Sequence, residues 1–481
     1  MDIRPVGFIL GCLISALAAA MLVPLGASIV LDDGEWAPIL SAMIASIFVG
    51  GTLILGLRPE RVKIDRRQGF LLTSLTWTIL PLFGALPLIW SDYDIGVVDG
   101  IFESVSGLTT TGSTVLVNLD TTDASLLLWR SMLQWLGGIG IVAMGIAILP
   151  FLKVGGMQVF RMESSDQSEK AVPRVRQLSA YLVSIYAALT VLCVLSYWLA
   201  GMSGFDAINH AMTTVSTGGY STSDLSFGKY PEPLAQWLCI LFMIGGAAPF
   251  GVYIYVLRGR RSAAIRNAQL RLMLLVLFGA SMALAAYLAV RTDIPFATAF
   301  RLAAFNVTSV VTTTGYASED YALWGAFAIT AFFVLTFVGG CSVSTSGGFK
   351  MYRFVILIRV FRTAMRSIIR PHAVSVAAID GRPINYEIVT AIAMFSIVYL
   401  ATILGLGLAL SLLGLDFITA LSGAATAVAN VGPGLGPTIG PAGNFSSLPD
   451  AAKLLLSLGM ILGRLEIITM AVLIMPDFWR R

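Results

Sequence analysis

Long apolar runs separated by short polar connections make up most of this chain. A helix needs about 20 predominantly apolar residues to cross the hydrocarbon core of a bilayer. Runs near that length lie at roughly 5–30, 36–57, 70–90, 125–150, 178–200, 233–257, 270–290, 322–340, 386–413 and 452–476. The pattern therefore predicts an all-α integral membrane protein with about ten transmembrane helices.

Four short polar tracts that contain glycine recur along the chain. They are residues 109–112 (TTTG), 216–219 (STGG), 312–315 (TTTG) and 429–432 (ANVG). Each tract follows an apolar segment too short to span a membrane and precedes a long one, and their last glycines are 107, 96 and 117 residues apart. Such self-similarity indicates a repeated unit. Here the unit is a spanning helix, a re-entrant pore half-helix, the tract and a second spanning helix.

The repeats divide the chain into five parts. Two leading transmembrane helices occupy 1–67, and four pore repeats occupy 68–160, 161–260, 261–382 and 383–481. Side-chain oxygens commonly cap helix N-termini, and the expected N-caps of the half-helices are Asp99, Asp206, Thr298 and Asp416. Gly112 and Gly219 each lie 13 positions after their aspartate, so Gly219, rather than Gly218, is the expected equivalent of Gly112.

Composition and charge fix the class and the orientation. The chain is 57% hydrophobic and 12% charged, whereas soluble domains carry about 25% charged residues, which excludes an ordinary soluble domain. Basic connections lie at 58–67, 153–176, 258–271 and 353–382, and acidic ones at 32–35, 92–99, 224–232 and 319–320. By the positive-inside rule, both termini are then cytoplasmic, and the four glycine tracts lie toward the outer side.

The tracts have the properties of a cation pathway. A half-helix that enters from outside points its partly negative C-terminal end at the middle of the membrane, where it favours a cation. An extended tract is tolerated at that depth only if it lines water or is buried in protein. Glycine allows the backbone to turn a carbonyl toward the axis, and carbonyls from several strands can replace the hydration shell of an ion.

We therefore expect the tracts to form one pseudo-fourfold cation filter. Its expected lining is Thr110, Thr111, Gly112, Gly218, Gly219, Thr313, Thr314, Gly315, Asn430, Val431 and Gly432. The alternative is that each tract is an ordinary Gly/Thr turn, but four tracts on one side of the membrane favour the pore. Glu103 and Asn306, in the first and third half-helices, are expected to support the filter by hydrogen bonds. Glu103 could instead supply negative charge near the filter.

A second glycine- and serine-rich segment lies at 339–348. Each glycine in a helix costs about 1 kcal/mol relative to alanine, so this run predicts a break, and a break at membrane depth must line a cavity. The expected gating residues are Gly339, Gly340, Ser342, Ser344, Thr345, Ser346, Gly347, Gly348 and Lys350. The segment could instead be the cytoplasmic end of a helix, but a helical pattern resumes at 352–369, which favours an internal gate.

Arg464 is the expected partner of this gate. A cation in the middle of an apolar helix costs at least about 2.5–3.5 kcal/mol on insertion scales, so it should face the protein interior and hold a partner. Glu466 lies only two positions away, and residues two apart do not share a helix face. We therefore expect Arg464 to donate to carbonyls of the 339–348 segment, which places a positive charge in the conduction path.

The sequence also bears on two rival classes, an enzyme and an ion-coupled symporter. An enzyme would need a catalytic cluster, and the two histidines, His210 and His372, fall on opposite sides of the membrane. A proton- or sodium-coupled symporter would need carboxylates at mid-membrane, for which only Glu103 and Glu466 are candidates. The symporter, or a pore that also passes sodium, stays the alternative. No organic cofactor or nucleic-acid partner is expected.

The motifs resemble those of the Trk/Ktr/HKT superfamily of potassium transporters, most closely the bacterial TrkH type. The resemblance covers essentially the whole chain and is carried by 102–114 (FESVSGLTTTGST), 214–220 (TVSTGGY), 305–317 (FNVTSVVTTTGYA) and 429–436 (ANVGPGLG). The two helices ahead of the first repeat resemble TrkH rather than KtrB, which lacks them.

The resemblance implies a potassium uptake protein of the bacterial inner membrane. It implies a homodimer with one pore per subunit, a cytoplasmic TrkA-like nucleotide-binding ring as regulator, and a gating role for the 339–348 loop and Arg464. In the HKT branch, a serine at the first filter glycine accompanies sodium preference. Glycine at 112, 219, 315 and 432 therefore implies potassium as the transported ion. The fourth tract departs most from the others, which implies weaker selectivity than in a symmetric channel.

Overall fold

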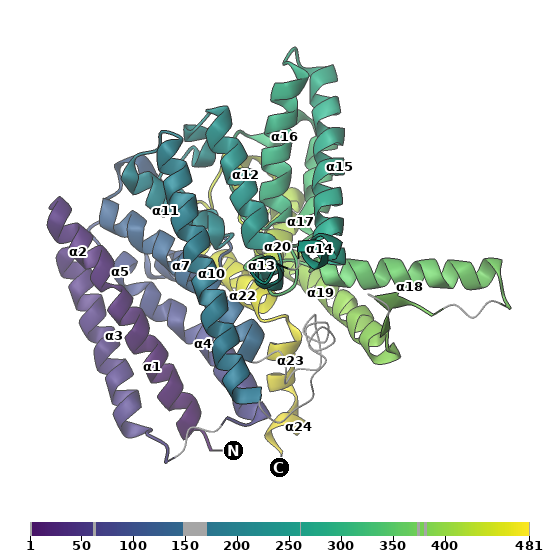
Figure 1. Cartoon of the computed structure of the whole chain (residues 1–481). Helices are drawn as coiled ribbons and strands as arrows, with labels where there is room; N and C mark the ends of the chain where they lie inside the picture. The colour runs from purple at the N-terminus through teal and green to yellow at the C-terminus, as the bar shows by residue number, and fades with distance from the viewer. Residues whose placement is uncertain are drawn as a thin grey trace.

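The computed structural model describes residues 2–60, 64–147, 171–259, 261–372, 376–379 and 382–480. These residues are almost wholly helical (Figure 1), apart from a short antiparallel pair of β1 (Ala378–Ile379) and β2 (Arg382–Pro383). The predicted all-α fold class is confirmed. The expected boundary between the first two repeats, at 160–161, lies outside the described residues, as does most of the basic connection at 153–176.

The leading part of the chain forms apolar helices at the left of Figure 1. It contains α1 (Arg4–Ala20), α2 (Leu22–Leu31) and α3 (Trp36–Gly56). A β-carbon added at Gly11 would lie 2.7 Å from the Gly50 carbonyl oxygen, and one added at Gly50 would lie 2.9 Å from the Gly11 carbonyl oxygen. Two backbones that meet through small residues are a common packing mode of membrane helices.

The next two groups of elements share one order: a long helix, a short helix before a tract, and a second helix after it. The first group is α4 (Arg66–Gly84), α5 (Leu86–Ile89), α6 (Val97–Leu108), η1 (Leu119–Thr121) and α7 (Ala124–Ala147). The second is α10 (Ala171–Leu199), α11 (Gly204–Val215), η2 (Ser226–Lys229), α12 (Pro233–Ala247) and α13 (Phe250–Leu257).

The last two groups follow the same order. The third is α14 (Arg261–Arg266), α15 (Ala268–Arg291), α16 (Phe296–Val311), η3 (Tyr321–Trp324), α17 (Ala326–Thr336) and α18 (Met351–Ile369). The fourth is α19 (Tyr386–Leu412), α20 (Phe417–Ala429), α21 (Gly436–Ile439), α22 (Asp450–Arg464), α23 (Ile468–Ile474) and α24 (Pro476–Trp479). Helix α18 projects sideways from the rest of the protein (Figure 1).

Of the half-helices α6, α11, α16 and α20, the first three begin earlier than their expected caps. The N-caps are Gly96, Ser203 and Pro295, so Asp99, Asp206 and Thr298 lie in the first turn instead. An acidic side chain is also favourable there, because it meets the partly positive helix N-terminus. Only Asp416 is the N-cap, and its carboxylate accepts the Thr419 N–H at 3.1 Å.

Two of the expected spans are bent. Helices α12 and α13 meet at 96°, and α22 and α23 meet at 106°. At the first bend, Pro249 has no N–H to continue the helix, and it favours the extended backbone of Ala248 (φ −72°, ψ 152°). At the second, Glu466 and Ile467 have positive φ values of 55° and 29°. The apolar pattern had predicted one spanning helix in each place.

The expected count of about ten spans is not reached by helix length and apolarity alone. Among the described residues, six helices are long and apolar enough to cross a membrane, and the two bent pairs would make eight. The remaining two expected spans, 125–150 and 322–340, correspond to α7 and to α17, which has only 11 residues. Helix α17 is shorter than expected because the glycine-rich segment after it is a loop.

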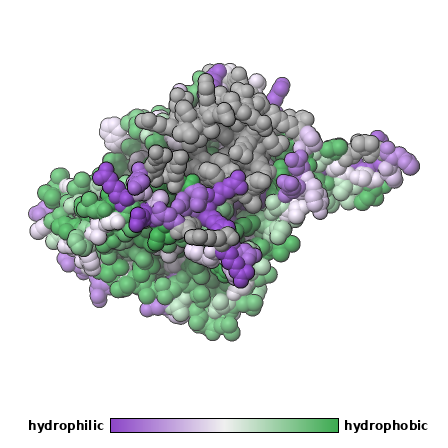
Figure 2. Space-filling view, turned by 90° about the horizontal axis from the view of Figure 1, so that it is seen from below, coloured by the Kyte–Doolittle hydropathy of each residue, from purple (hydrophilic) through white to green (hydrophobic). Residues whose placement is uncertain are grey.

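The two ends of the chain lie at the same end of the protein (Figure 1). Hydrophilic residues gather across the middle of the face seen from that end, and hydrophobic residues cover much of the surface around it (Figure 2). Such a distribution suits a protein whose sides contact lipid and whose end contacts water.

Candidate ion-binding site

The four glycine tracts have the same backbone conformation. The residue two positions before the last glycine of each tract has a left-handed backbone conformation. Its φ values are 52° at Thr110, 54° at Thr217, 56° at Thr313 and 54° at Asn430. The last residue has φ values of 87° at Gly112, 78° at Gly219, 86° at Gly315 and 114° at Gly432. A β-branched residue rarely adopts positive φ, and such strain concentrates at functional sites. Gly219, rather than Gly218, therefore matches Gly112, as its spacing from Asp206 predicted.

The tracts meet in a ring in which each glycine touches a carbonyl of another tract. A β-carbon added at Gly112 would lie 2.1 Å from the Gly218 oxygen, and one added at Gly219 would lie 1.9 Å from the Thr314 oxygen. At Gly315 the distance to the Val431 oxygen would be 2.1 Å, and at Gly432 the distance to the Thr111 oxygen would be 2.9 Å. We call these four oxygens the carbonyl ring. Backbone carbonyl oxygens can replace the hydration shell of an ion.

In each of the first three tracts, a polar side chain nine residues before the last glycine forms a hydrogen bond with the segment that follows the tract. Glu103 accepts the Val115 N–H at 2.9 Å and the Thr114 hydroxyl at 3.0 Å. His210 Nε2 lies 3.1 Å from the Ser221 hydroxyl. Asn306 donates to the Ser318 hydroxyl at 2.8 Å and accepts the Ser318 N–H at 3.2 Å. In the fourth tract the same position is Gly423, and Ser422 accepts the Leu435 N–H at 2.9 Å instead.

Glu103 is neutralised by an arginine. The Arg130 guanidinium on α7 lies 2.8 Å from the Glu103 carboxylate, and both side chains are almost fully buried, with exposed fractions of 1% and 0%. Arg130 also donates to the Thr114 hydroxyl at 3.1 Å and lies over the Tyr220 ring, 4.3 Å from its centroid. Because the two charges cancel, Glu103 brings no net charge to the ring.

Tyrosines connect neighbouring tracts. Tyr220, directly after the second tract, donates its hydroxyl to the Glu103 carbonyl at 2.8 Å. Tyr316, directly after the third tract, donates in the same way to the His210 carbonyl at 3.2 Å. Between the fourth and first tracts, Ser113 donates to the Gly432 carbonyl at 2.8 Å. These bonds fix the relative positions of the tracts, and with them the shape of the carbonyl ring.

A loop at residues 337–350, called the crossing loop here, connects α17 to α18 and lies against the starts of the tracts. Thr217 donates to the Thr345 hydroxyl at 3.2 Å, and the Gly347 N–H donates to the Thr313 hydroxyl at 2.7 Å. A β-carbon added at Gly347 would lie 2.9 Å from the Asn430 β-carbon. The loop thus touches the left-handed residues of three tracts on the half-helix side of the ring.

The bend between α12 and α13 holds the crossing loop. The Cys341 N–H donates to the Ala247 carbonyl at 3.0 Å, and the Phe250 N–H donates to the Val343 carbonyl at 3.0 Å. Both groups lack a helical partner because Pro249 interrupts the helix between them. Gln269 on α15 accepts the Ser342 N–H at 2.9 Å. Other expected gating residues bond within the loop. The Gly340 N–H donates to the Ser346 hydroxyl, the Ser344 hydroxyl to the Cys341 carbonyl, and the Lys350 ammonium to the Ser346 carbonyl.

Arg464 lies between the crossing loop and the first tract. Its Nη2 donates to the Thr345 carbonyl at 2.6 Å and to the Thr110 hydroxyl at 2.7 Å, and the side chain is buried. Glu466, in the bend after α22, pairs with Arg353 on α18 at 2.8 Å. The Arg464 guanidinium therefore lies where the crossing loop contacts the tracts.

The opposite side of the ring opens toward a small cavity of about 70 Å³. Gly112, Gly219 and Gly315 line it, together with Asp224 and Arg130. The residues that line it are the last glycines of the first three tracts and residues that come after the tracts, whereas the crossing loop contacts the starts of the tracts. Cavity and loop therefore lie on opposite sides of the carbonyl ring.

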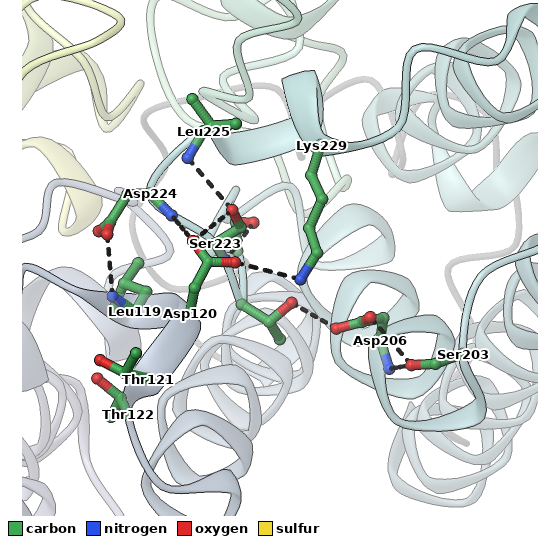
Figure 3. A network of polar contacts seen from close by, with 12 residues as sticks. Leu119, Asp120, Thr121, Thr122, Ser203, Asp206, Ser223, Asp224, Leu225 and Lys229 are labelled. Atoms are coloured by element: carbon green, nitrogen blue, oxygen red, sulfur yellow. Dashed lines mark hydrogen bonds and ion pairs between the residues drawn. The ribbon is translucent and has the colours of Figure 1, made fainter.

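Polar contacts between the loops after the first two tracts border this cavity (Figure 3). Asp120 accepts from the Ser223 hydroxyl at 2.8 Å and pairs with the Lys229 ammonium at 3.3 Å, and Asp224 accepts the Leu119 N–H at 3.2 Å. Burial alone would raise the pKa of Asp120, but hydrogen bonds from Ser223 and Asp224 and the Lys229 charge lower it overall. Asp120 therefore stays ionised at neutral pH.

Sequence reasoning missed Arg130 and Gln134. Both side chains are buried on α7, and both contact residues that surround the tracts. They lie one helical turn apart in an otherwise apolar run. A charged and an amide side chain on one face of a spanning helix are costly unless they face the protein interior, and that pattern was the available signal.

These features define a class: a multi-pass, all-helical membrane protein in which four similar groups of elements meet at one carbonyl ring. Comparison with known proteins identifies the family. The profile of the TrkH family, described as a cation transport protein, matches residues 37–480, and the chain belongs to that family.

Similar proteins extend over the whole chain. The Trk system potassium uptake protein TrkI of Halomonas elongata is 49% identical over 480 residues, which cover 99% of this chain and 97% of that protein. The Trk system potassium uptake protein TrkH of Escherichia coli (strain K12) is 34% identical over 487 residues, with 100% of both chains covered. The crystal structure of the potassium transporter TrkH from Vibrio parahaemolyticus matches with a TM-score of 0.92, at 31% identity and with 100% of both chains covered.

Proposed function

We propose that this protein takes up potassium across the bacterial inner membrane through a filter formed by its four glycine tracts. The observation that carries the proposal is the carbonyl ring, in which the oxygens of Thr111, Gly218, Thr314 and Val431 each lie against a positive-φ glycine of another tract. Carbonyl oxygens converging on one axis replace the water around a potassium ion. The names of the relatives support potassium as the cargo.

In this proposal the groups of elements act as four pore repeats after two leading helices, with the limits 1–67, 68–160, 161–260, 261–382 and 383–481. The filter lining is Thr110, Thr111, Gly112, Gly218, Gly219, Thr313, Thr314, Gly315, Asn430, Val431 and Gly432. Glu103 and Asn306 support the filter, since each holds the chain that leaves its own tract.

The crossing loop acts as the gate. Its contacts with Thr217 and Thr313 close the half-helix side of the ring, and Arg464 holds it there through the Thr345 carbonyl. A fixed positive charge at this point also opposes a passing cation. Opening requires these hydrogen bonds to break, which makes the loop a switch that a partner can control.

We further propose that the protein is a homodimer with one pore per subunit, regulated by a cytoplasmic TrkA-like nucleotide-binding ring. The relatives are named as parts of a Trk system, which supports association with other components. Both termini and a hydrophilic surface lie at one end of the protein (Figures 1 and 2). The basic connections support a cytoplasmic location for that end, by the positive-inside rule.

Flux measurements on purified protein in liposomes test the proposal. We expect potassium to move down its own gradient in the absence of a proton or sodium gradient, and to move faster than sodium under matched conditions. Empty liposomes and liposomes with heat-denatured protein are the controls. Absence of potassium flux in both the presence and the absence of ion gradients would contradict the proposed function.

The alternative is a symporter coupled to protons or sodium. Such a protein needs a carboxylate that can bind the coupling ion in the membrane. The two candidate carboxylates are each paired with an arginine, Glu103 with Arg130 and Glu466 with Arg353. This pairing favours a channel-like mechanism. Potassium accumulation against its gradient, driven by an imposed proton or sodium gradient, would favour the symporter.

Gly112→Ser is expected to raise sodium permeation relative to potassium permeation. The new β-carbon would lie 2.1 Å from the Gly218 oxygen, and φ is 87° at Gly112, so the carbonyl ring must shift. Bi-ionic flux in liposomes measures the permeability ratio. Gly279→Ser is the matched control, because a β-carbon there meets nothing within 4 Å. An unchanged ratio in folded Gly112→Ser protein would place Gly112 outside the filter.

A further inference from the structure

Gln134 occupies the place where the second tract lacks a side chain. The residue before the last glycine is Thr111, Thr314 or Val431 in the other tracts, but Gly218 in the second. A β-carbon added at Gly218 would lie 2.4 Å from both the Cδ and the Oε1 of Gln134. The glutamine amide, which comes from α7, therefore fills the space that a tract side chain would need.

The same amide forms hydrogen bonds on both sides of Gly219. Gln134 Nε2 donates to the Gly218 carbonyl at 2.7 Å, and the Tyr220 N–H donates to Gln134 Oε1 at 3.0 Å. The Gly218 oxygen is one of the four in the carbonyl ring. A carbonyl oxygen has two lone pairs, so it can accept from Gln134 and still face an ion.

The packing of α7 brings Gln134 to this point. A β-carbon added at Gly137 would lie 2.0 Å from the Leu108 carbonyl oxygen, and one at Gly138 would lie 2.9 Å from the Ser216 β-carbon. These glycines let α7 approach the ends of two half-helices, and Gln134, one turn earlier, is fully buried against the tract.

The first and third tracts use their own hydroxyl groups where the second uses Gln134. The Thr111 hydroxyl lies 2.7 Å from the Thr109 hydroxyl, and the Thr314 hydroxyl lies 2.8 Å from the Thr312 hydroxyl. Gly218 has no side chain to form such a bond. A donor from another helix is therefore needed to fix the backbone of the second tract.

We propose that Gln134 is a positioning residue that holds the Gly218 carbonyl in the ring and thereby helps to determine the preference for potassium over sodium. This inference rests on the proposed function, in which the ring is the filter. A carbonyl released from its donor can move inward toward a smaller ion. Loss of the Gln134 bond should therefore favour sodium permeation more than potassium permeation. A neutral hydrogen bond of ordinary net strength corresponds to about a two- to tenfold change in the permeability ratio.

Gln134→Leu tests the proposal, because leucine is similar in size but cannot donate or accept. We expect the sodium-to-potassium permeability ratio, measured by bi-ionic flux in liposomes, to rise about two- to tenfold. Ser131→Ala is the matched control, since Ser131 is buried on the same helix and its hydroxyl bonds to the Leu127 carbonyl. A wild-type ratio in folded Gln134→Leu protein would overturn the proposal. A wild type without potassium preference would instead overturn the proposed function.

An exchange of side chains gives a second test that does not depend on how well Gln134→Leu folds. Gly218→Thr alone should fold poorly, because its β-carbon collides with the Gln134 amide. Combined with Gln134→Ala, it gives the second tract the Thr-Gly sequence of the first and third. We expect this double variant to have a ratio closer to wild type than Gln134→Ala alone. Equal ratios in these two proteins would contradict the idea that Gln134 replaces a tract side chain.

Discussion

Replacing Arg464 with alanine is expected to raise the potassium flux per folded protein by about one to two orders of magnitude. Arg464 donates to the Thr345 carbonyl and to the Thr110 hydroxyl, and thereby holds the crossing loop against the tracts. A hydrogen bond from a charged donor contributes about 1.5–3 kcal/mol, and about 1.4 kcal/mol corresponds to a tenfold shift in an equilibrium. If the crossing loop is the gate, loss of one such bond shifts the closed-to-open ratio by that amount. Flux in liposomes, normalised to folded protein, measures it.

Two further variants separate the contributions of Arg464. Arg464→Lys keeps a positive charge between the crossing loop and the first tract but presents one ammonium in place of the planar fork, so it should raise flux less than alanine does. Ser457→Ala, on the same helix with its hydroxyl bonded to the Lys453 carbonyl, is the control. The ratio of sodium to potassium flux should barely change in either variant, because the carbonyl ring is untouched. Equal or lower flux from well-folded Arg464→Ala protein would end the gating proposal.

The repeated tracts could be predicted from the sequence because their signal is local. Glycine and threonine at fixed spacing after a short apolar segment specify a backbone turn, and the same spacing identified Gly219 as the equivalent of Gly112. All four last glycines have positive φ. Arg464 was also predictable, since a cation in an apolar helix needs an interior partner, and its bond to the Thr345 carbonyl agrees with that reasoning.

The bends and the caps were less predictable because they depend on tertiary contacts. The apolar run at 233–257 reads as one helix, although Pro249 lies inside it. A proline in a membrane helix often produces only a kink. Here the break is wide because the crossing loop bonds to Ala247 and Phe250 on both sides of it. The N-caps are likewise Gly96 and Ser203 instead of the expected Asp99 and Asp206. The sequence did not distinguish these positions, because an acidic residue suits both the cap and the first turn.

Contacts between distant segments could not be predicted from the sequence for a different reason. Gln134 and Gly218 are 84 residues apart, and nothing near either residue identifies the other. Only the close approach of α7 to the second tract, through Gly137 and Gly138, shows that the amide fills a missing side chain. The same holds for Arg130, whose partner Glu103 lies 27 residues earlier on another helix.

Arg130→Leu is expected to lower the free energy of unfolding by about 3–5 kcal/mol, because it leaves the Glu103 carboxylate buried without a counter-charge. The two side chains have exposed fractions of only 1% and 0%, so water cannot replace the guanidinium. Unfolding in detergent, followed by denaturant or temperature, measures the loss. Lys229→Ala is the control, since the Lys229–Asp120 pair has exposed fractions of 36% and 47% and should contribute less than about 1 kcal/mol.

A double variant shows whether the stranded charge causes the loss. Glu103→Gln combined with Arg130→Leu removes both charges and keeps an amide oxygen that can accept the Val115 N–H, which Glu103 accepts at 2.9 Å. We expect it to be more stable than Arg130→Leu alone, because a buried neutral amide costs far less than a buried unpaired charge. If Glu103 instead served as a free negative charge for the ion, Arg130→Leu would fold normally and increase potassium flux. A double variant no more stable than Arg130→Leu would mean that Arg130 acts through its contacts with Tyr220 and Thr114 rather than through the pair.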